Sequence, residues 1–190
     1  MKKRVLAVLM SVCLLVTSVF SLGILVSAES GYVLTELDYM INGTKMVNSY
    51  RELISHGVVW DTPVDLKALG HGEKKLGLQM DFYVSGGDLD MVRKASGQIE
   101  LTSSGGGDRE EIYWNTSDIN WKEGEWVRQV FPLASAHTTG GTLNPEALNY
   151  MRVYFVGLEE KFVSEQITLK IGNVRIVDMD QPAPSLEEDP

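Results

Sequence analysis

Cysteine and histidine are scarce in this sequence. The only cysteine among 190 residues, Cys13, lies in the apolar N-terminal segment. Beyond residue 28 the chain can therefore form neither an internal disulfide nor a thiolate metal site. The three histidines, His56, His71 and His137, lack the HExxH spacing of a zinc site, and no G-x-S-x-G nucleophile elbow occurs. The sequence thus shows no signature of a metallohydrolase or a serine hydrolase.

The one long apolar run is confined to residues 1–28. A basic head, MKKR, precedes the run, and VSAES then places Val26 and Ala28 at the small-residue positions of a signal-peptidase site. This pattern predicts a secretory signal peptide cleaved before Glu29. The alternative is an uncleaved N-terminal anchor, because about 20 apolar residues can span a bilayer. We expect cleavage, and hence a secreted, extracellular protein that leaves the membrane.

The charge balance is acidic. The formal net charge is −9, and loss of Lys2, Lys3 and Arg4 with the signal peptide makes it −12. Such acidity opposes nucleic acid and anionic lipid as partners, because both are polyanions. The 162 residues from 29 to 190 suffice for one domain with a sizeable core.

The C-terminal stretch MDQPAPSLEEDP, residues 179–190, is acidic and rich in proline. It predicts a disordered tail or a linker, with the domain proper over residues 29–178. A linker would place the domain beside a neighbouring module or a surface protein, whereas a tail would be only a frayed terminus.

Between the two ends the chain alternates short β-like runs with turn residues. Helical signals are few: NPEALNY with Asn144 as N-cap, VDLKALG, and SYRELIS, which is equally compatible with a strand. These patterns predict an all-β fold, a two-sheet antiparallel β-sandwich or jelly roll with few short helical turns. The predicted strands cover residues 56–66, 74–85, 97–103, 109–115, 123–133, 149–157 and 165–178.

The last predicted strand changes phase. Ile167, Leu169 and Ile171 share one parity, whereas Val174 and Ile176 share the other. A β-bulge produces this kind of shift, because it inserts one extra residue into a strand. We therefore predict a bulge at Gly172–Asn173.

The clearest strand is LGLQMDFYVS, residues 76–85. Leu76, Leu78, Met80, Phe82 and Val84 occupy one face, and the second face is polar but carries an aromatic ring. This second face presents Gln79, Asp81 and Tyr83.

A similar outward set follows later in the chain, at Tyr150, Arg152 and Tyr154. If the two strands share a sheet, these residues form a polar, ring-studded surface in which Arg152 can pair with sugar hydroxyls or a uronate. If the surface is only solvated, we expect an Asp81–Arg152 ion pair that contributes little.

The order of six segments resembles the jelly-roll carbohydrate-binding modules of bacterial glycoside hydrolases and cell-surface proteins. The segments are LGLQMDFYVS, GQIELTSSG, EEIYWN, EWVRQVFPL, TTGGTLNPEALNYMRVYF and ITLKIGNVRIVD, and the resemblance covers roughly residues 45–178. It implies non-catalytic binding of a poly- or oligosaccharide.

The resemblance also implies a structural calcium ion. Family members commonly carry an acidic residue where this chain has Gly172. The remaining acidic candidates are Asp178 near the end of the domain and Glu36 or Asp38 near its start. Calcium prefers six to eight oxygen ligands, which such residues and loop carbonyls supply.

Sugar recognition requires flat aromatic faces. Trp121 lies in the polar loop TSDINWKEGE and is the indole we expect to be exposed. Trp114 and Tyr113 are adjacent, so one faces inward and the other outward. By resemblance to the family, Trp126 is expected to close one end of the core. The predicted ligand-binding residues are Gln79, Asp81, Tyr83, Trp114, Trp121, Arg152 and Tyr154.

Three functions follow from these patterns, and the first is favoured. It is a secreted, non-catalytic module that binds polysaccharide through an exposed sheet face. The second is a structural or adhesive spacer of a bacterial surface protein. The third is a glycan-cleaving enzyme with paired carboxylates such as Asp81 and Glu100. The glycine-rich loop SSGGGDREE, residues 103–111, lacks the lysine of a phosphate cradle and predicts a hairpin turn lined with acids.

Overall fold

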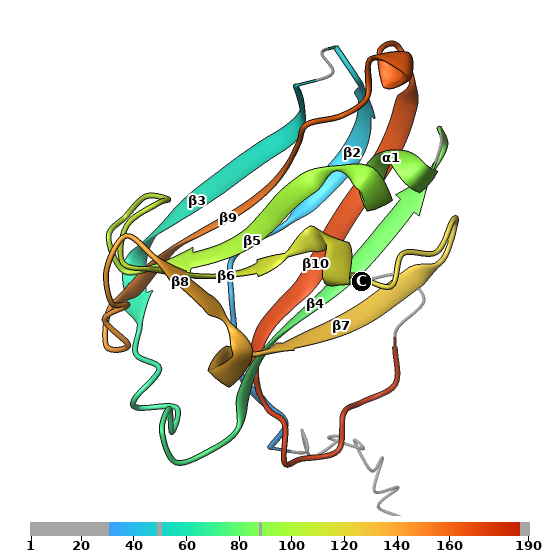
Figure 1. Cartoon of the computed structure of the whole chain (residues 1–190). Helices are drawn as coiled ribbons and strands as arrows, with labels where there is room; N and C mark the ends of the chain where they lie inside the picture. Colours follow the sequence, from blue (N-terminus) through green and yellow to red (C-terminus); the bar gives the residue numbers. More distant parts are fainter. Residues whose placement is uncertain (1–30, 49–50, 88, 187–190) are drawn as a thin grey trace, which may run out of the picture.

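The structure, a computed structural model, describes residues 31–48, 51–87 and 89–186. The predicted signal peptide and residues 187–190 of the predicted tail lie outside these ranges. In the described residues the chain forms two antiparallel sheets packed as a sandwich, as predicted (Figure 1).

Sheet A has the strand order β1-β10-β4-β7, with β2 also paired to β10. Its strands are β1 (Val33–Glu36), β2 (Ile41–Met46), β4 (Leu76–Ser85), β7 (Trp126–Pro132) and β10 (Gln166–Asp178).

Sheet B has the strand order β3-β9-β5-β6-β8. Its strands are β3 (Glu52–Val64), β5 (Ser96–Thr102), β6 (Glu111–Asn115), β8 (His137–Thr139) and β9 (Leu148–Val156). The chain crosses repeatedly from one sheet to the other.

The helical content of the described residues is small. One α-helix, α1 (Leu89–Lys94), follows β4 and is not among the predicted elements. The same residues form three 3₁₀ turns: η1 (Thr116–Asp118), η2 (Leu133–Ser135) and η3 (Glu160–Phe162). At NPEALNY the chain makes a single turn, in which Asn144 Oδ1 accepts a hydrogen bond from the backbone N–H of Glu146 at 3.1 Å. SYRELIS belongs to β3 from Glu52 onward.

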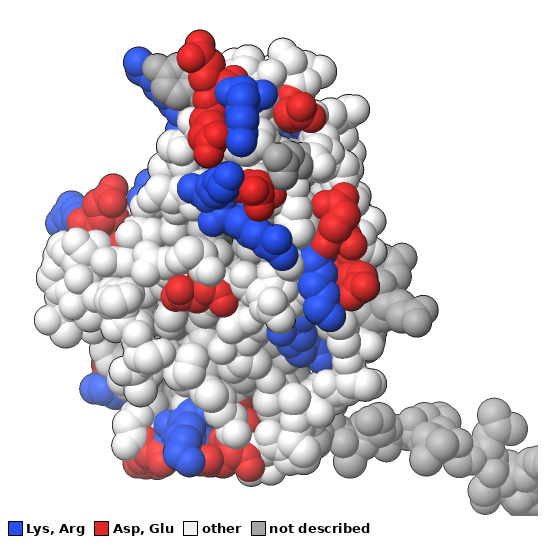
Figure 2. Space-filling view, turned by 45° about the vertical axis from the view of Figure 1, so that its right-hand side comes forward, with Lys and Arg blue, Asp and Glu red and all other residues white. Residues whose placement is uncertain are grey.

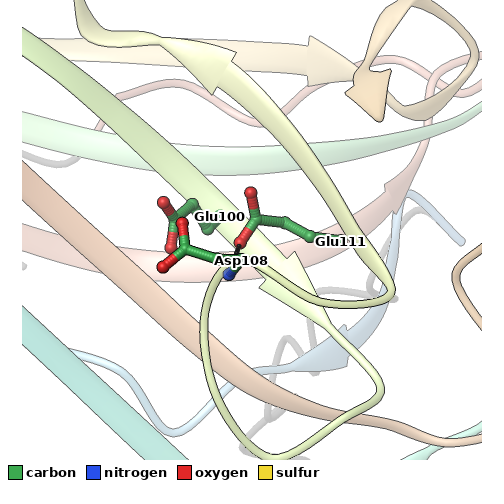
Figure 3. Close-up of side chains that lie close together, drawn as sticks. All are labelled: Glu100, Asp108 and Glu111. Atoms are coloured by element: carbon green, nitrogen blue, oxygen red, sulfur yellow. Dashed lines mark hydrogen bonds between the residues drawn. The ribbon is translucent and has the colours of Figure 1, made fainter. Parts of the chain in front are cut away.

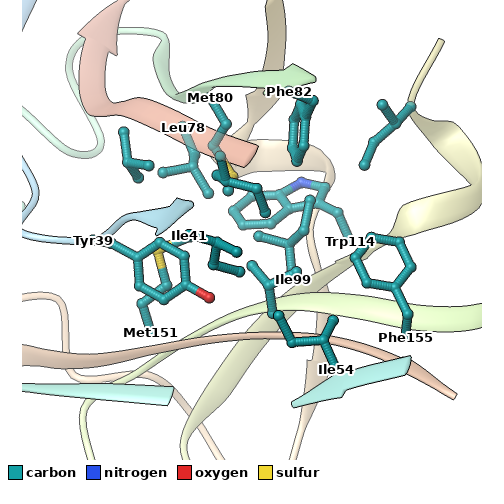
Figure 4. Close-up of a cluster of buried hydrophobic side chains, with 14 of the residues drawn as sticks. Tyr39, Ile41, Ile54, Leu78, Met80, Phe82, Ile99, Trp114, Met151 and Phe155 are labelled. Atoms are coloured by element: carbon teal, nitrogen blue, oxygen red, sulfur yellow. The ribbon is translucent and has the colours of Figure 1, made fainter. Parts of the chain in front are cut away.

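The core lies between the two sheets (Figure 4). The predicted inward residues of β4 are all buried, at 4% exposure or less. Their burial contributes roughly 7–15 kcal/mol gross, at about 1.5–3 kcal/mol for each side chain. The facing residues come from sheet B, where the predicted inward set Met151, Val153 and Phe155 is fully buried. The alternation read from the sequence is therefore confirmed in both sheets.

The predicted bulge in β10 is confirmed. The register between β10 and β4 shifts between Gly172 and Arg175, and Asn173 has a φ of 47°. Before the bulge β10 pairs with β2, and after it β10 pairs with β1. The short connection between β1 and β2, residues 37–40, therefore crosses beside the bulge.

Candidate functional site

The structure separates the two outward sets that were expected to share a surface. Tyr83 is in β4 of sheet A, and Tyr154 is in β9 of sheet B. Since both point away from the core, they lie on opposite outer faces of the sandwich. The prediction that the two sets form one surface is therefore wrong, and so is the prediction of an Asp81–Arg152 ion pair. Parity shows on which side of its strand a residue lies but not which sheet the strand joins.

Gln79 and Asp81 are fully buried although they are on the outer face of sheet A. Arg128 donates from Nε and Nη2 to the two Asp81 oxygens at 2.7 Å each, and Asn173 donates to Oδ2 at 2.9 Å. Arg128 Nη1 also donates to the carbonyls of Pro184 and Ser185. The described part of the C-terminal segment thus covers this half of the face, and the expectation that Gln79 and Asp81 are open to a ligand is wrong.

Trp114 and Trp121 belong to the core. They are 4% and 2% exposed, respectively. Trp121 packs against Phe82 and Phe155, with ring centroids 5.4 and 5.8 Å apart, and its indole N–H donates to the Thr116 carbonyl at 3.3 Å. The prediction that Trp121 is an exposed indole in a polar loop is therefore wrong, and Trp114 is the inward member of its pair.

Tyr83 lies instead in a row with Lys170 and Trp126. The register of sheet A pairs Asn42 with Lys170, Lys170 with Tyr83 and Tyr83 with Trp126, so all four share the outer face. The Tyr83 and Trp126 rings are 5.4 Å apart at 47°. Lys170 Nζ lies 5.4 Å from the Tyr83 centroid and 6.0 Å from that of Trp126. Both rings are half-buried, which leaves part of each accessible.

A cavity of about 330 Å³ opens beside this row. It lies where the connection between β1 and β2 passes the bulge in β10. We call it the sheet A cavity. Its lining includes Met40, Asn42, Trp126, Lys170, Gly172 and Asn173. The volume is near the lower end of the range typical of small-molecule sites.

The chemistry of the sheet A cavity suits a neutral polar ligand with apolar C–H faces. The Trp126 indole in the cavity wall and the neighbouring Tyr83 ring offer flat surfaces. Asn42 and Lys170 offer hydrogen-bond donors, and Glu36 and Asp38 add acceptors. Figure 2, which brings forward the side on the right of Figure 1, shows acidic and basic side chains mixed, with wide uncharged areas between them. This side carries no continuous patch of one sign that would select a polyion.

On the outer face of sheet B, polar side chains form hydrogen bonds and ion pairs with one another. Arg152 Nε and Nη2 donate to the two oxygens of Glu100 at 2.6 and 2.9 Å. The Tyr154 hydroxyl is within 2.7 Å of Gln98 Oε1 and donates to it. The Tyr113 ring stacks on His137 at 5.1 Å. Glu100 engages Nε and Nη2 of Arg152, and Asp108 also contacts Nη2, so most of the guanidinium is paired within the protein instead of open to sugar hydroxyls as expected.

Three carboxylates meet on this outer face of sheet B (Figure 3). Ligand oxygens of Glu100, Asp108 and Glu111 all lie within 4.8 Å of one another. Burial raises the pKa of Glu111 to about 7, and the charges of Glu100 and Asp108 act in the same direction. The backbone N–H of Asp108 and the charge of Arg152 oppose the shift of this pKa.

Glu111 should therefore make stability depend on pH. Its pKa in the folded protein lies above its ordinary value of 4.5, so the folded state binds more protons and the stabilisation is present below pH 4.5. It is lost as the pH rises through about 7. We expect the free energy of unfolding to fall between pH 5 and 8. The protein is treated with a chelator first, so that no bound metal ion affects the titration of these carboxylates. Urea unfolding at several pH values should show a flatter profile for Glu111→Gln, and equal profiles would contradict the assignment. Glu73→Gln, at an exposed acid, is the control.

The expected calcium ligands are not brought together. Glu36 forms a salt bridge with Arg175 at 2.7 Å, and Asp178 lies 3.5 Å from Lys74 Nζ. Asp38 lines the sheet A cavity. Within the described ranges, the only group of three or more close acidic, histidine or cysteine ligands is Glu100, Asp108 and Glu111. A site built from Glu36, Asp38 and Asp178 is therefore not formed.

Trp126 and Lys170 were not predicted as ligand-binding residues, although a signal for Trp126 exists in the sequence. In WVRQVFP, Val127 and Phe131 are the buried parity, which leaves Trp126 and Arg128 on the outer one. Applied to this strand, the rule used for β4 would have placed the indole outside. Lys170 follows from the same rule in β10.

Comparisons with known proteins do not assign this chain to a family. No protein-family model and no curated protein sequence matches it. Among the residues that the structure describes, no helix has the length and apolar character needed to cross a membrane.

Proposed function

We propose that this chain is a secreted, non-catalytic module that binds a poly- or oligosaccharide in the sheet A cavity. The observation that carries the proposal is the pair of half-exposed rings, Tyr83 and Trp126, beside a cavity lined by Asn42 and Lys170. A sugar ring has two apolar C–H faces and an equatorial rim of hydroxyls, and this arrangement offers a partner to each. The resemblance of six sequence segments to carbohydrate-binding modules supports the same conclusion.

The positions of the acids also support a binding role. Asp81 and Glu100, the carboxylates considered as a catalytic pair, are on opposite outer faces of the sandwich. Each is engaged by an arginine through two hydrogen bonds. Two carboxylates that flank one glycosidic bond must lie within about 10 Å of each other, which these positions do not provide.

Trp126→Ala should weaken glycan binding at least tenfold, because loss of about 1.4 kcal/mol of stacking and burial lowers affinity by that factor. Affinity electrophoresis against a panel of plant and cell-wall glycans would identify a ligand, and calorimetry would measure its Kd. Tyr113→Ala is the matched control, since it removes a half-buried ring from the outer face of sheet B.

The outcome of this comparison locates the site. Loss of affinity in Tyr113→Ala but not in Trp126→Ala would move the site to sheet B and overturn the assignment to the cavity. If no glycan in the panel binds and a protein partner is captured instead, the chain is a spacer or adhesive domain.

A further inference from the structure

The glycine-rich loop between β5 and β6, residues 103–110, folds back onto the outer face of sheet B. Gly106 accepts a hydrogen bond from Thr102 Oγ1 at 3.0 Å, and the N–H of Gly105 donates to Asn149 Oδ1 at 2.9 Å. The N–H of Asp108 donates to Glu111 Oε2 at 2.7 Å. These contacts hold the Asp108 side chain beside two carboxylates of the sheet.

The three carboxylates differ in exposure. Glu100 and Glu111 are fully buried, while the Asp108 side chain is 80% exposed. The cluster is therefore closed on the side of the sheet and open on the side of the loop. Asp108 is thus the member of the group that solvent reaches.

Arg152 supplies part of the opposing charge. It forms the bidentate pair with Glu100, and its contact with Asp108 Oδ1 is longer, at 3.4 Å. One guanidinium faces three carboxylates, so the group carries an excess of two negative charges when all three are ionised. The arginine engages the Glu100 side of the group, and within the described ranges Glu111 forms no ion pair with a basic side chain.

A separate observation concerns Glu111 Oε1. This oxygen is buried and has no hydrogen-bond partner in the described part of the chain, although Oε2 of the same carboxyl accepts from Asp108. A buried polar atom without a partner is destabilising and uncommon. Figure 3 shows the carboxyl group that carries it facing Asp108 and Glu100. This oxygen thus lacks one partner, which a hydrogen-bond donor or a cation can supply.

We propose that Glu100, Asp108 and Glu111 hold one divalent cation, for which calcium is the best fit. All three ligands are oxygens, which calcium prefers, and calcium accepts six to eight ligands in irregular geometry, so water and loop carbonyls can complete the shell. The cation would neutralise the excess charge, satisfy Glu111 and fix loop 103–110 on sheet B. Because the sheet A cavity is on the opposite face, this site is independent of glycan binding.

Thermal unfolding of chelator-treated protein at pH 7.5, with and without added calcium chloride, tests the proposal. We expect the midpoint to rise by about 5–10 °C at a calcium concentration about 100 times the Kd. Calorimetry should show one ion bound per chain. Magnesium chloride in a parallel series should give a smaller rise, since Mg²⁺ demands stricter octahedral geometry.

Glu111→Gln should abolish the calcium-induced rise while keeping the shape of the side chain. Asp108→Asn, at the exposed ligand, should reduce it without any risk to the core, and Glu73→Gln should leave it unchanged. Absence of a rise with either metal would overturn the proposal, as would a full rise in both Glu111→Gln and Asp108→Asn. Glycan affinity should be the same in calcium and in chelator.

Discussion

Trp121→Ala should lower the free energy of unfolding by about 3–5 kcal/mol, the usual range for removing a large buried aromatic side chain. Trp121 is 2% exposed and contacts Phe82 from sheet A and Phe155 from sheet B. Its removal would open a cavity between the sheets and leave the Thr116 carbonyl without its indole donor. Urea unfolding followed by circular dichroism gives the measurement.

Trp126→Ala is the matched control, because it removes the same side chain from a half-buried position. We expect it to cost less than about 1.5 kcal/mol, since truncation of a half-buried side chain at the surface leaves no enclosed cavity. The two variants should thus impair different properties: Trp121→Ala lowers stability, whereas Trp126→Ala weakens glycan binding. A small loss of stability for Trp121→Ala would contradict the burial of this indole between the sheets.

Arg128→Met should be similarly severe, at about 3–5 kcal/mol, because it leaves a buried carboxylate without its counter-charge. Asp81 is fully buried and receives two hydrogen bonds from Arg128 at 2.7 Å. Methionine replaces the apolar stem of the arginine, so the loss reports on the ion pair. Chemical unfolding at pH 7 measures it.

A double variant separates the contribution of the Asp81–Arg128 ion pair from that of the surrounding residues. Asp81→Asn combined with Arg128→Met removes both charges, and we expect it to recover at least half of the loss. Lys75→Met is the control, because its partner Asp180 is exposed and such pairs contribute about 0–1 kcal/mol. Equal effects of Arg128→Met and Lys75→Met would contradict the burial of Asp81.

Local periodicity accounts for what the sequence predicts correctly. The core face of β4 and the phase change at Gly172–Asn173 follow from a period of two residues, which each strand carries within itself. No knowledge of the neighbouring strands is needed for either feature.

Sheet membership is not local, and the predicted surface failed for that reason. Tyr83 and Tyr154 have the same outward parity, but which strands pair depends on contacts between distant segments. The true neighbours of Tyr83, Lys170 and Trp126, come from two strands that the pattern could not place beside it.

The fate of each tryptophan depends on packing rather than on composition. Trp121 is surrounded by polar residues in the sequence, yet its loop turns the indole into the space between the sheets. The conformation of such a loop depends on tertiary contacts, which cannot be inferred from the residues next to Trp121 in the sequence. Trp126, by contrast, could be placed by strand parity alone.

The offset at Gly172–Asn173 links the recess on one side of the molecule to the interior. Beyond it, Val174 and Ile176 reach the core only because the strand has changed phase. Loss of one residue at this bulge would change more than the surface. It would also move the side chains of the last five residues of β10 to the opposite face of the sheet. Selection for a stable interior alone would thus preserve the hollow, even in a lineage that no longer used it.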